Sequence, residues 1–206
     1  MAIGYHDSTI RILNDIGGYQ GTGTLERNIE DIASGTNCIV LTHPHMDHIG
    51  DLPRLFTGGK TYAGRIIATP GTKRATEVAL KDAAKIQMEF YTRAMEKFEE
   101  ARKDIRKLIH TIESYEKRTP EKTRSGNNLR KSNEPTRLNR RDTAIELLDT
   151  KYGILQKNPN GTVEVPSNWE ELIAPPPPTF VLEDVERAVA HIETQNISDG
   201  WQDIVP

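Results

Sequence analysis

The chain has 206 residues, of which 35% are hydrophobic and 28% are charged, and its formal net charge is −3 at pH 7. This length suffices for one domain with a hydrophobic core, although the hydrophobic fraction is low for a compact α/β enzyme. The net charge excludes an argument for nucleic-acid binding from overall charge, so any basic surface must be local. A single cysteine excludes an internal disulfide, and no run of about 18 apolar residues occurs. These features predict a cytoplasmic protein that does not associate with membranes.

The first predicted elements are a strand, a short helix and a second strand. Residues 9–13 alternate weakly between apolar and polar side chains and lead to Asp15. Residues 25–32 place their apolar side chains on one side of a helix, and the apolar run at 37–41 is typical of a buried strand. This order of elements predicts a layered α/β domain.

A cluster of potential metal ligands follows the second strand directly. The run HPHMDH contains three of the six histidines in the chain. Imidazole nitrogens and carboxylate oxygens bind zinc and, less selectively, manganese or iron. In an extended backbone His43 and His45 project to one side and could bind one ion, while Asp47 and His48, in a turn that opens a helix over 49–56, could bind a second. We therefore predict a two-metal hydrolytic centre in preference to a histidine-rich loop without metal.

These residues and several later runs resemble a known family. The HxHxDH pattern from His43 to His48 resembles the signature of the metallo-β-lactamase superfamily of hydrolases. The run DHIGDLPRL that overlaps it, ATPGT at 68–72 and DAAKIQ at 82–87 are similar to motifs of the β-CASP RNA-processing nucleases in that superfamily. The helix expected at 182–192 is similar to one that these nucleases place before their next sheet strands. The resemblance covers only the N-terminal portion of the proteins in this family.

The resemblance implies a fold, a cofactor and roles for two aspartates. The fold would be of the α/β (α+β) class, a partial metallo-β-lactamase αββα sandwich with a long helical hairpin inserted. The cofactor would be zinc, with two ions in the complete site and manganese as an alternative. Asp15 would fix ligand histidines by hydrogen bonds, although an ordinary turn at the end of a strand explains it equally well without the family. Asp47 would also be catalytic, because it could orient the attacking water or accept its proton.

From residue 91 onward the chain takes on a charged helical pattern. Apolar residues recur in steps of three and four up to Tyr115, and the apolar positions at 144–152 predict a returning helix, so that 91–156 form a helical hairpin. The tip at 117–141 carries nine basic and two acidic side chains. The candidate nucleic-acid contacts in it are Arg130, Lys131, Arg137, Arg140 and Arg141. They would contact phosphates rather than bases, and a disordered solvated loop explains the composition at least as well.

The predicted domains leave a metal site that is half built. Residues 1–90 would be the N-terminal half of the metallo-β-lactamase-like domain, and residues 157–206 a linker and a helix that lead to a missing second half. The superfamily site needs two further histidines and a bridging aspartate. We therefore expect a second polypeptide or a missing C-terminal segment to complete the site.

Three functions are open. The first is a metal-dependent hydrolase, a phosphodiesterase or ribonuclease that acts on RNA, present here as an N-terminal fragment with an incomplete dinuclear site. The runs ATPGT and DAAKIQ favour it. The second is a small-molecule metallo-hydrolase, for which the charged helix and the basic loop would have no purpose. The third is a non-catalytic interaction module derived from this fold, which the absent ligands favour.

Overall fold

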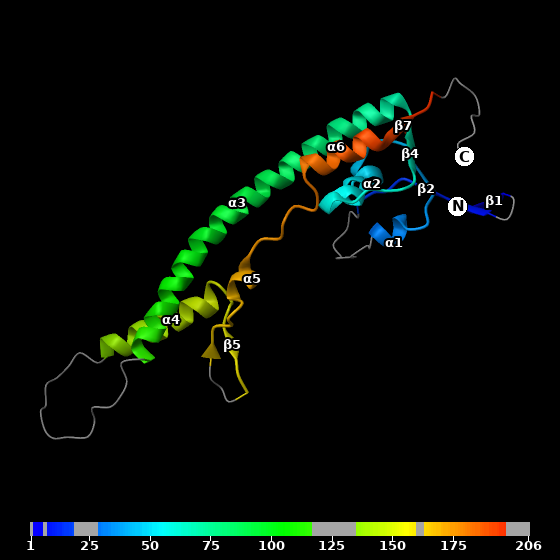
Figure 1. Ribbon diagram of the computed structural model, residues 1–206. Coiled ribbons are helices and arrows are strands. Elements are labelled where there is room, and N and C mark those ends of the chain that lie inside the picture. Colours follow the sequence, from blue (N-terminus) through cyan, green and yellow to red (C-terminus); the bar gives the residue numbers. More distant parts are fainter. Residues whose placement is uncertain (1, 6–7, 19–28, 117–134, 160–162, 197–206) are drawn as a thin grey trace, which may run out of the picture. The chain divides into compact units, whose positions relative to one another are not determined.

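The computed structural model describes residues 2–5, 8–18, 29–116, 135–159 and 163–196. Its contacts divide the chain into two compact units (Figure 1). The first unit combines Met1–Phe90 with Pro177–Pro206, and the second is Tyr91–Pro176. None of the described helices combines the length and the apolar composition that a bilayer crossing requires.

A five-stranded sheet in the order β1-β2-β3-β4-β7 forms the centre of the first unit. The strands are β1 (Ala2–Tyr5), β2 (Ser8–Asn14), β3 (Cys38–Val40), β4 (Arg65–Ala68) and β7 (Ile192–Thr194). β1 runs antiparallel to β2, whereas β2, β3, β4 and β7 are parallel neighbours. This mostly parallel sheet, accompanied by helices, confirms the predicted α/β class.

The middle strands are apolar because they are covered by other parts of the unit. Ile39 of β3 pairs with Ile66 of β4, and both side chains are fully buried. Such uninterrupted apolar runs are typical of parallel strands that are covered on both faces. The core cluster also includes side chains from the helices α1 (Ile29–Ala33) and α6 (Leu182–His191).

The helix predicted at 49–56 is wrong in its bounds and type. The structure has a short helix α2 (Met46–Ile49) that ends at Gly50, followed by a 3-10 helical segment η1 (Leu52–Gly59). Pro53 has no N–H with which to continue the hydrogen bonds of α2. The regular part of η1 ends at Thr57, whose ψ is 146°, and the backbone then turns to a φ of 64° at Gly58.

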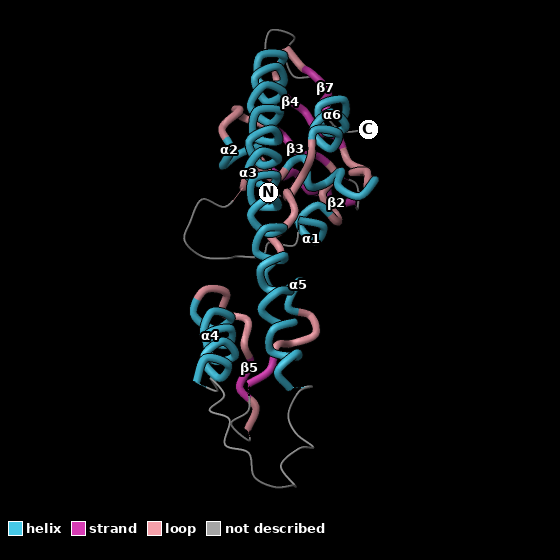
Figure 2. Tube along the Cα trace, turned by 90° about the vertical axis from the view of Figure 1, so that its left-hand side faces the viewer, coloured by secondary structure: helices cyan, strands magenta, loops and turns pink. Residues whose placement is uncertain are grey.

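One continuous helix, α3 (Pro70–Glu116), contains both the motif at 82–87 and the charged helical pattern expected from 91 onward. The ATPGT run spans the end of β4 and the start of α3. The Thr69 hydroxyl oxygen accepts a hydrogen bond from the N–H of Thr72 at 3.1 Å, and Pro70 occupies the first helical position, where a missing N–H costs nothing. The first turns of α3 lie beside α6 both in Figure 1 and in Figure 2. Gln87 accepts two hydrogen bonds from Thr179 in the segment before α6.

The second unit contains the rest of α3, two further helices and a small hairpin. These are α4 (Pro135–Thr150), β5 (Gln156–Lys157), β6 (Val163–Glu164) and α5 (Trp169–Ile173), and β5 and β6 pair antiparallel. Among the described residues, its buried cluster consists of Ile105, Leu148, Ile154 and Trp169. α4 occupies the place of the predicted returning helix.

The predicted basic tip falls mostly outside the described residues. Arg130 and Lys131 lie there, and the same holds for the side chain of Arg137. Arg140 is exposed and Arg141 is partly exposed on α4. The nucleic-acid contacts predicted for this tip therefore stay predictions.

Candidate metal centre

The potential ligands lie at one edge of the sheet, where β2 and β3 end. Asp15 directly follows β2, and the segment that carries His43 begins three residues after β3. The Asp15 N–H donates a hydrogen bond of 3.0 Å to the carbonyl of Val40, the last residue of β3. Because β2 and β3 are parallel, their carboxyl ends meet at the same edge, which is where open α/β sheets bind ligands.

Backbone hydrogen bonds join the end of β2 to the segment around α2. The N–H of Ile16 donates to the carbonyl of His48 at 2.8 Å, and the carbonyl of Ile16 accepts from the N–H of Asp51 at 3.1 Å. At Gly17 a Cβ atom would overlap the backbone carbonyl of Asp47, so this close approach requires glycine. The backbone that follows β2 and the backbone around α2 therefore hold each other in place.

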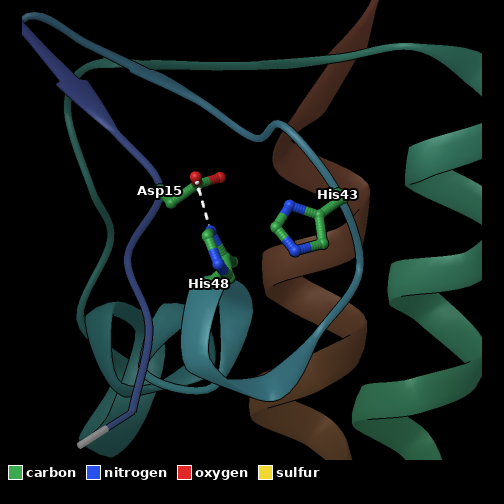
Figure 3. Close-up of side chains that lie close together, drawn as sticks. All are labelled: Asp15, His43 and His48. Atoms are coloured by element: carbon green, nitrogen blue, oxygen red, sulfur yellow. Dashed lines mark hydrogen bonds and ion pairs between the residues drawn. The ribbon is translucent and has the colours of Figure 1, made fainter.

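Three side chains converge at this edge, as Figure 3 shows. Asp15, His43 and His48 each offer one ligand atom, and these atoms lie within 4.8 Å of one another. The ring centroids of His43 and His48 are 3.8 Å apart, and all three residues are partly buried. One carboxylate and two imidazoles at this separation form a possible metal-binding site.

Asp15 is the centre of the hydrogen bonds in this group. Its Oδ1 accepts the backbone N–H of Thr42 at 2.8 Å, and its Oδ2 accepts the Thr42 hydroxyl at 2.7 Å. The same Oδ2 lies 2.8 Å from Nδ1 of His48. The backbone φ of Asp15 is +60°, in the left-handed region that aspartate tolerates better than most residues. Because three of its roughly four acceptor positions are taken, Asp15 is better suited to hold His48 than to bind an ion.

The pKa of Asp15 lies below its ordinary value of 3.8. Burial alone would raise this pKa, but the hydrogen bonds from the backbone of Thr42, from His48 and from the Thr42 hydroxyl outweigh it, together with the charge of His48. The carboxylate is therefore ionised at neutral pH and only accepts hydrogen bonds.

His45 and Asp47 lie next to this group but are not part of the cluster of three. His45 directly precedes α2, and its ring centroid is 4.7 Å from that of His43. The side chain of Asp47 is half exposed, and its Oδ2 lies 3.6 Å from Nε2 of His48. All five residues predicted for the metal site thus lie at one edge of the sheet, with Asp47 beside His48 and His45 beside His43.

The arrangement contains one residue that the sequence reasoning missed. Thr42 contacts both Asp15 and His43, since its Oγ1 lies 3.0 Å from Nδ1 of His43 as well as 2.7 Å from Oδ2 of Asp15. Its only signal in the sequence is its place directly before His43.

A cavity of about 350 Å³ opens beside this group of candidate ligands. Asp15, Asp47 and His48 line it from one side, and Ile29 and Ile32 of α1 add apolar walls. The half-exposed carboxylate of Asp47 is therefore accessible from the cavity.

The other histidines in the described part of the chain lie away from this edge. Nε2 of His191 lies 2.9 Å from the carbonyl oxygen of Gly64, and its ring contacts those of Phe56 and Tyr62. His110 is exposed on the part of α3 that belongs to the second unit. Neither position resembles a ligand site.

Comparison with known proteins finds a partial match to a ribonuclease. The chain is 38% identical to Ribonuclease TTHA0252 of Thermus thermophilus over 82 residues. The match covers 38% of this chain and 18% of that protein, so the chain corresponds to less than a fifth of the relative's length. No family model matches the chain.

Proposed function

We propose that this chain carries the N-terminal metal-binding portion of a metallo-β-lactamase-fold hydrolase of the β-CASP branch, which cleaves phosphodiester bonds in RNA. The observation that carries the proposal is the convergence of His43 and His48 beside Asp15 where two parallel strands end, with His45 and Asp47 next to them. The partial match to a protein named as a ribonuclease supports RNA as the substrate class.

The residues at this edge fit a divalent metal ion by their chemistry. Imidazole nitrogens and carboxylate oxygens are donors for zinc and for manganese. Nδ1 of His43 faces Thr42 and Nδ1 of His48 faces Asp15, so Nε2 of each ring faces away from its protein partner. We assign His43 and His45 to one ion and Asp47 with His48 to a second.

The protein groups would divide the work as follows. A bound divalent ion lowers the pKa of water and stabilises charge on a phosphoryl oxygen. Asp47, whose half-exposed carboxylate faces the cavity, orients the attacking water or accepts its proton. Asp15 holds the ring of His48 through Oδ2. The cavity beside Asp47 receives the scissile phosphate.

Four ligands are too few for two ions with complete protein coordination. Among the described residues, the metal-binding cluster includes no histidine from outside the segment 43–48. We therefore propose that further ligands come from additional polypeptide, either in the same protein or in a partner.

Zinc binding to the purified 206-residue chain tests the site. Isothermal titration with zinc should show saturable binding that is lost in His43→Ala and in His48→Ala. His110→Ala, which removes an exposed histidine of the second unit, serves as the matched control and should bind as the unaltered chain does. Equal zinc binding by all variants would overturn the site, and two tightly held ions per chain would overturn the need for further ligands.

RNA cleavage tests the substrate. The protein, purified from its native host with any polypeptide bound to it, should cleave end-labelled RNA in the presence of zinc or manganese, and a chelator or His43→Ala should abolish the cleavage. Hydrolysis of nitrophenyl esters without RNA cleavage would instead assign a small-molecule hydrolase. If neither the purified 206-residue chain nor the protein from its native host binds zinc, and no RNA is cleaved, the result would instead assign a non-catalytic interaction module.

A further inference from the structure

The Thr42 hydroxyl connects Asp15 to His43 within the candidate metal site. It lies 2.7 Å from Oδ2 of Asp15 and 3.0 Å from Nδ1 of His43. A second bond to the same aspartate, from the N–H of Thr42 to Oδ1 at 2.8 Å, fixes the backbone at this position independently of the side chain. The hydroxyl is therefore held in place whichever way its hydrogen points.

The direction of each hydrogen bond in this chain of groups follows from Asp15. A carboxylate at neutral pH has no hydrogen to give and only accepts. The Thr42 hydroxyl must then donate its single hydrogen to Asp15, which leaves its oxygen lone pairs to accept. The contact between Thr42 Oγ1 and His43 Nδ1 can be a hydrogen bond only if the hydrogen is on the histidine nitrogen.

The same reasoning applies to His48. Its Nδ1 lies 2.8 Å from Oδ2 of Asp15, which accepts, so Nδ1 of His48 carries the hydrogen. Both rings therefore carry a hydrogen on Nδ1, and in the neutral form of each ring the lone pair is on Nε2. Asp15 acts on His48 directly and on His43 through the Thr42 hydroxyl.

We propose that Thr42 is a positioning residue that fixes His43 in the Nδ1–H tautomer and so reserves Nε2 of His43 for metal. This inference rests on the proposed metal-dependent function for its purpose, but the tautomer itself is a property of the metal-free chain. Loss of such an outer hydrogen-bond partner lowers metal affinity about 10–100-fold in characterised sites. Because Thr42 is exposed and water can partly replace its hydroxyl, we expect the lower end of that range.

Two substitutions at Thr42 separate the hydroxyl from the shape of the side chain. Thr42→Val keeps the shape of the side chain and the backbone N–H that bonds Asp15, but it removes the hydroxyl that links Asp15 to His43. Thr42→Ser keeps the hydroxyl and removes only the methyl group. Thr57→Val is the matched control elsewhere in the first unit, because the hydroxyl of Thr57 donates to the carbonyl of Arg54 at 3.0 Å.

Long-range proton–nitrogen NMR of the metal-free 206-residue chain reads the tautomer. The His43 signals are assigned by their absence in His43→Gln. We expect the Nδ1–H pattern in the unaltered chain, in Thr42→Ser and in Thr57→Val, and a shift toward the Nε2–H form in Thr42→Val. Zinc titration should show about a tenfold loss of affinity in Thr42→Val and less than about threefold in Thr42→Ser.

The outcomes are decisive in both directions. A His43 ring that keeps the Nδ1–H form in Thr42→Val overturns the proposal, even if zinc affinity falls. The proposal also fails if Thr42→Ser behaves like Thr42→Val, since the methyl group would then be the cause. If neither the unaltered chain nor the protein purified from its native host binds zinc, the proposed function fails, yet the NMR spectra still decide whether Thr42 sets the tautomer.

Discussion

The two units of the chain are stabilised in different ways. In the first unit, strands β3 and β4 contribute fully buried residues such as Ile39 and Ile66 to a core that helices α1 and α6 also share. In the second unit the buried cluster of described residues is small, and Glu170 pairs with Arg102 at 3.0 Å and with Arg106 at 2.7 Å at the surface. Exposed ion pairs contribute little stability, so the second unit depends on this small cluster and on the partly buried apolar side chains packed against it.

This difference explains where the candidate chemistry lies. A metal site needs donors whose positions are fixed more closely than a mobile surface allows, and a densely packed sheet provides such a base. Asp15 and His43 both follow strands that belong to the large core. The ion-paired second unit has no comparable group of donors among the described residues.

Truncation of one fully buried isoleucine in each unit has the largest expected effect. Ile66→Ala and Ile105→Ala both remove side chains with 0% exposure, and each should lower the free energy of unfolding of its own unit by about 2–5 kcal/mol. Urea unfolding followed by circular dichroism measures both. Only Ile66→Ala should also weaken zinc binding, because β4 pairs with the strand that leads to His43. An equal loss of zinc affinity in Ile105→Ala would show that the two units depend on each other.

A methyl group at Gly17 should disturb the site directly. Gly17→Ala places Cβ against the backbone of Asp47, which cannot move without breaking the hydrogen bonds of Ile16, so we expect about 3 kcal/mol of destabilisation and a loss of zinc binding. Gly71→Ala is the control. A Cβ at that exposed position of α3 meets nothing closer than 4.0 Å and should stabilise the helix by about 0.5–1 kcal/mol. Thermal unfolding and zinc titration of both variants would show whether close approach is the cause.

Replacement of the charged acceptor should have a smaller effect on stability but a clear effect on metal binding. In Asp15→Asn the amide group presents N–H donors to Thr42 or His48, which also donate, so we expect about 1–3 kcal/mol of destabilisation. Zinc affinity should fall about 10–100-fold by isothermal titration. Asp82→Asn, an exposed carboxylate on α3, should leave both quantities unchanged. Full zinc affinity in Asp15→Asn would exclude a positioning role for Asp15.

The smallest effect is expected for the ion pair between β4 and β7. Arg65 Nη2 lies 2.5 Å from Glu193 Oε2, and the hydrogen bond from Arg65 is the main reason that the pKa of Glu193 lies below its ordinary 4.5, against the opposing effect of burial. A lowered folded-state pKa contributes stability above about pH 4.5, and this contribution is lost as the pH falls through the folded-state value. Since both side chains are partly exposed, Glu193→Gln should cost less than about 1 kcal/mol at neutral pH.

Urea unfolding at neutral pH and below about pH 3 measures the difference in free energy of unfolding between the unaltered chain and Glu193→Gln. The two proteins should differ at neutral pH and converge in acid, because the Glu193 carboxyl is then protonated in the unaltered chain as well. A difference of the same size at both pH values would mean that Glu193 acts by packing and not by charge.

The elements that sequence reasoning predicted correctly are those specified by local residue patterns. The apolar run at 37–41 contains β3, and the weak alternation at 9–13 lies within β2. The position of the HPHMDH run just after β3 could be predicted for the same reason. Propensity and periodicity act over a few residues, and here they agree with the fold.

The elements that it missed depend on distant parts of the chain. The helical pattern was extended through Ile192, but Ile192 begins β7 and pairs with Ile66, which lies far away in the sequence. No local pattern distinguishes a three-residue strand from the last turn of a helix. The single α3 helix was missed because the motif at 82–87 and the charged pattern from 91 onward were interpreted as separate segments.

The candidate site was predicted in its residue types but not in its contacts. The sequence placed five metal-site residues near each other, and the ring of His43 lies close to that of its predicted partner His45 but closer still to that of His48. This arrangement arises because α2 folds the chain back after His45. The left-handed backbone of Asp15 and the bridging hydroxyl of Thr42 follow from the meeting of two strand ends, which the order of residues alone does not reveal.

The hydrogen bonds between Ile16 and the residues around α2 have a consequence for how quickly an ion would be captured. Because the main chain on both sides of the donors is already joined in the metal-free protein, little conformational entropy remains to be lost when an ion arrives. Uptake should therefore follow a single fast step set by ligand exchange, without a slow ordering phase. Protein treated with a chelator and protein exposed to zinc should give nearly superimposable amide NMR spectra, except at the residues that contact the ion.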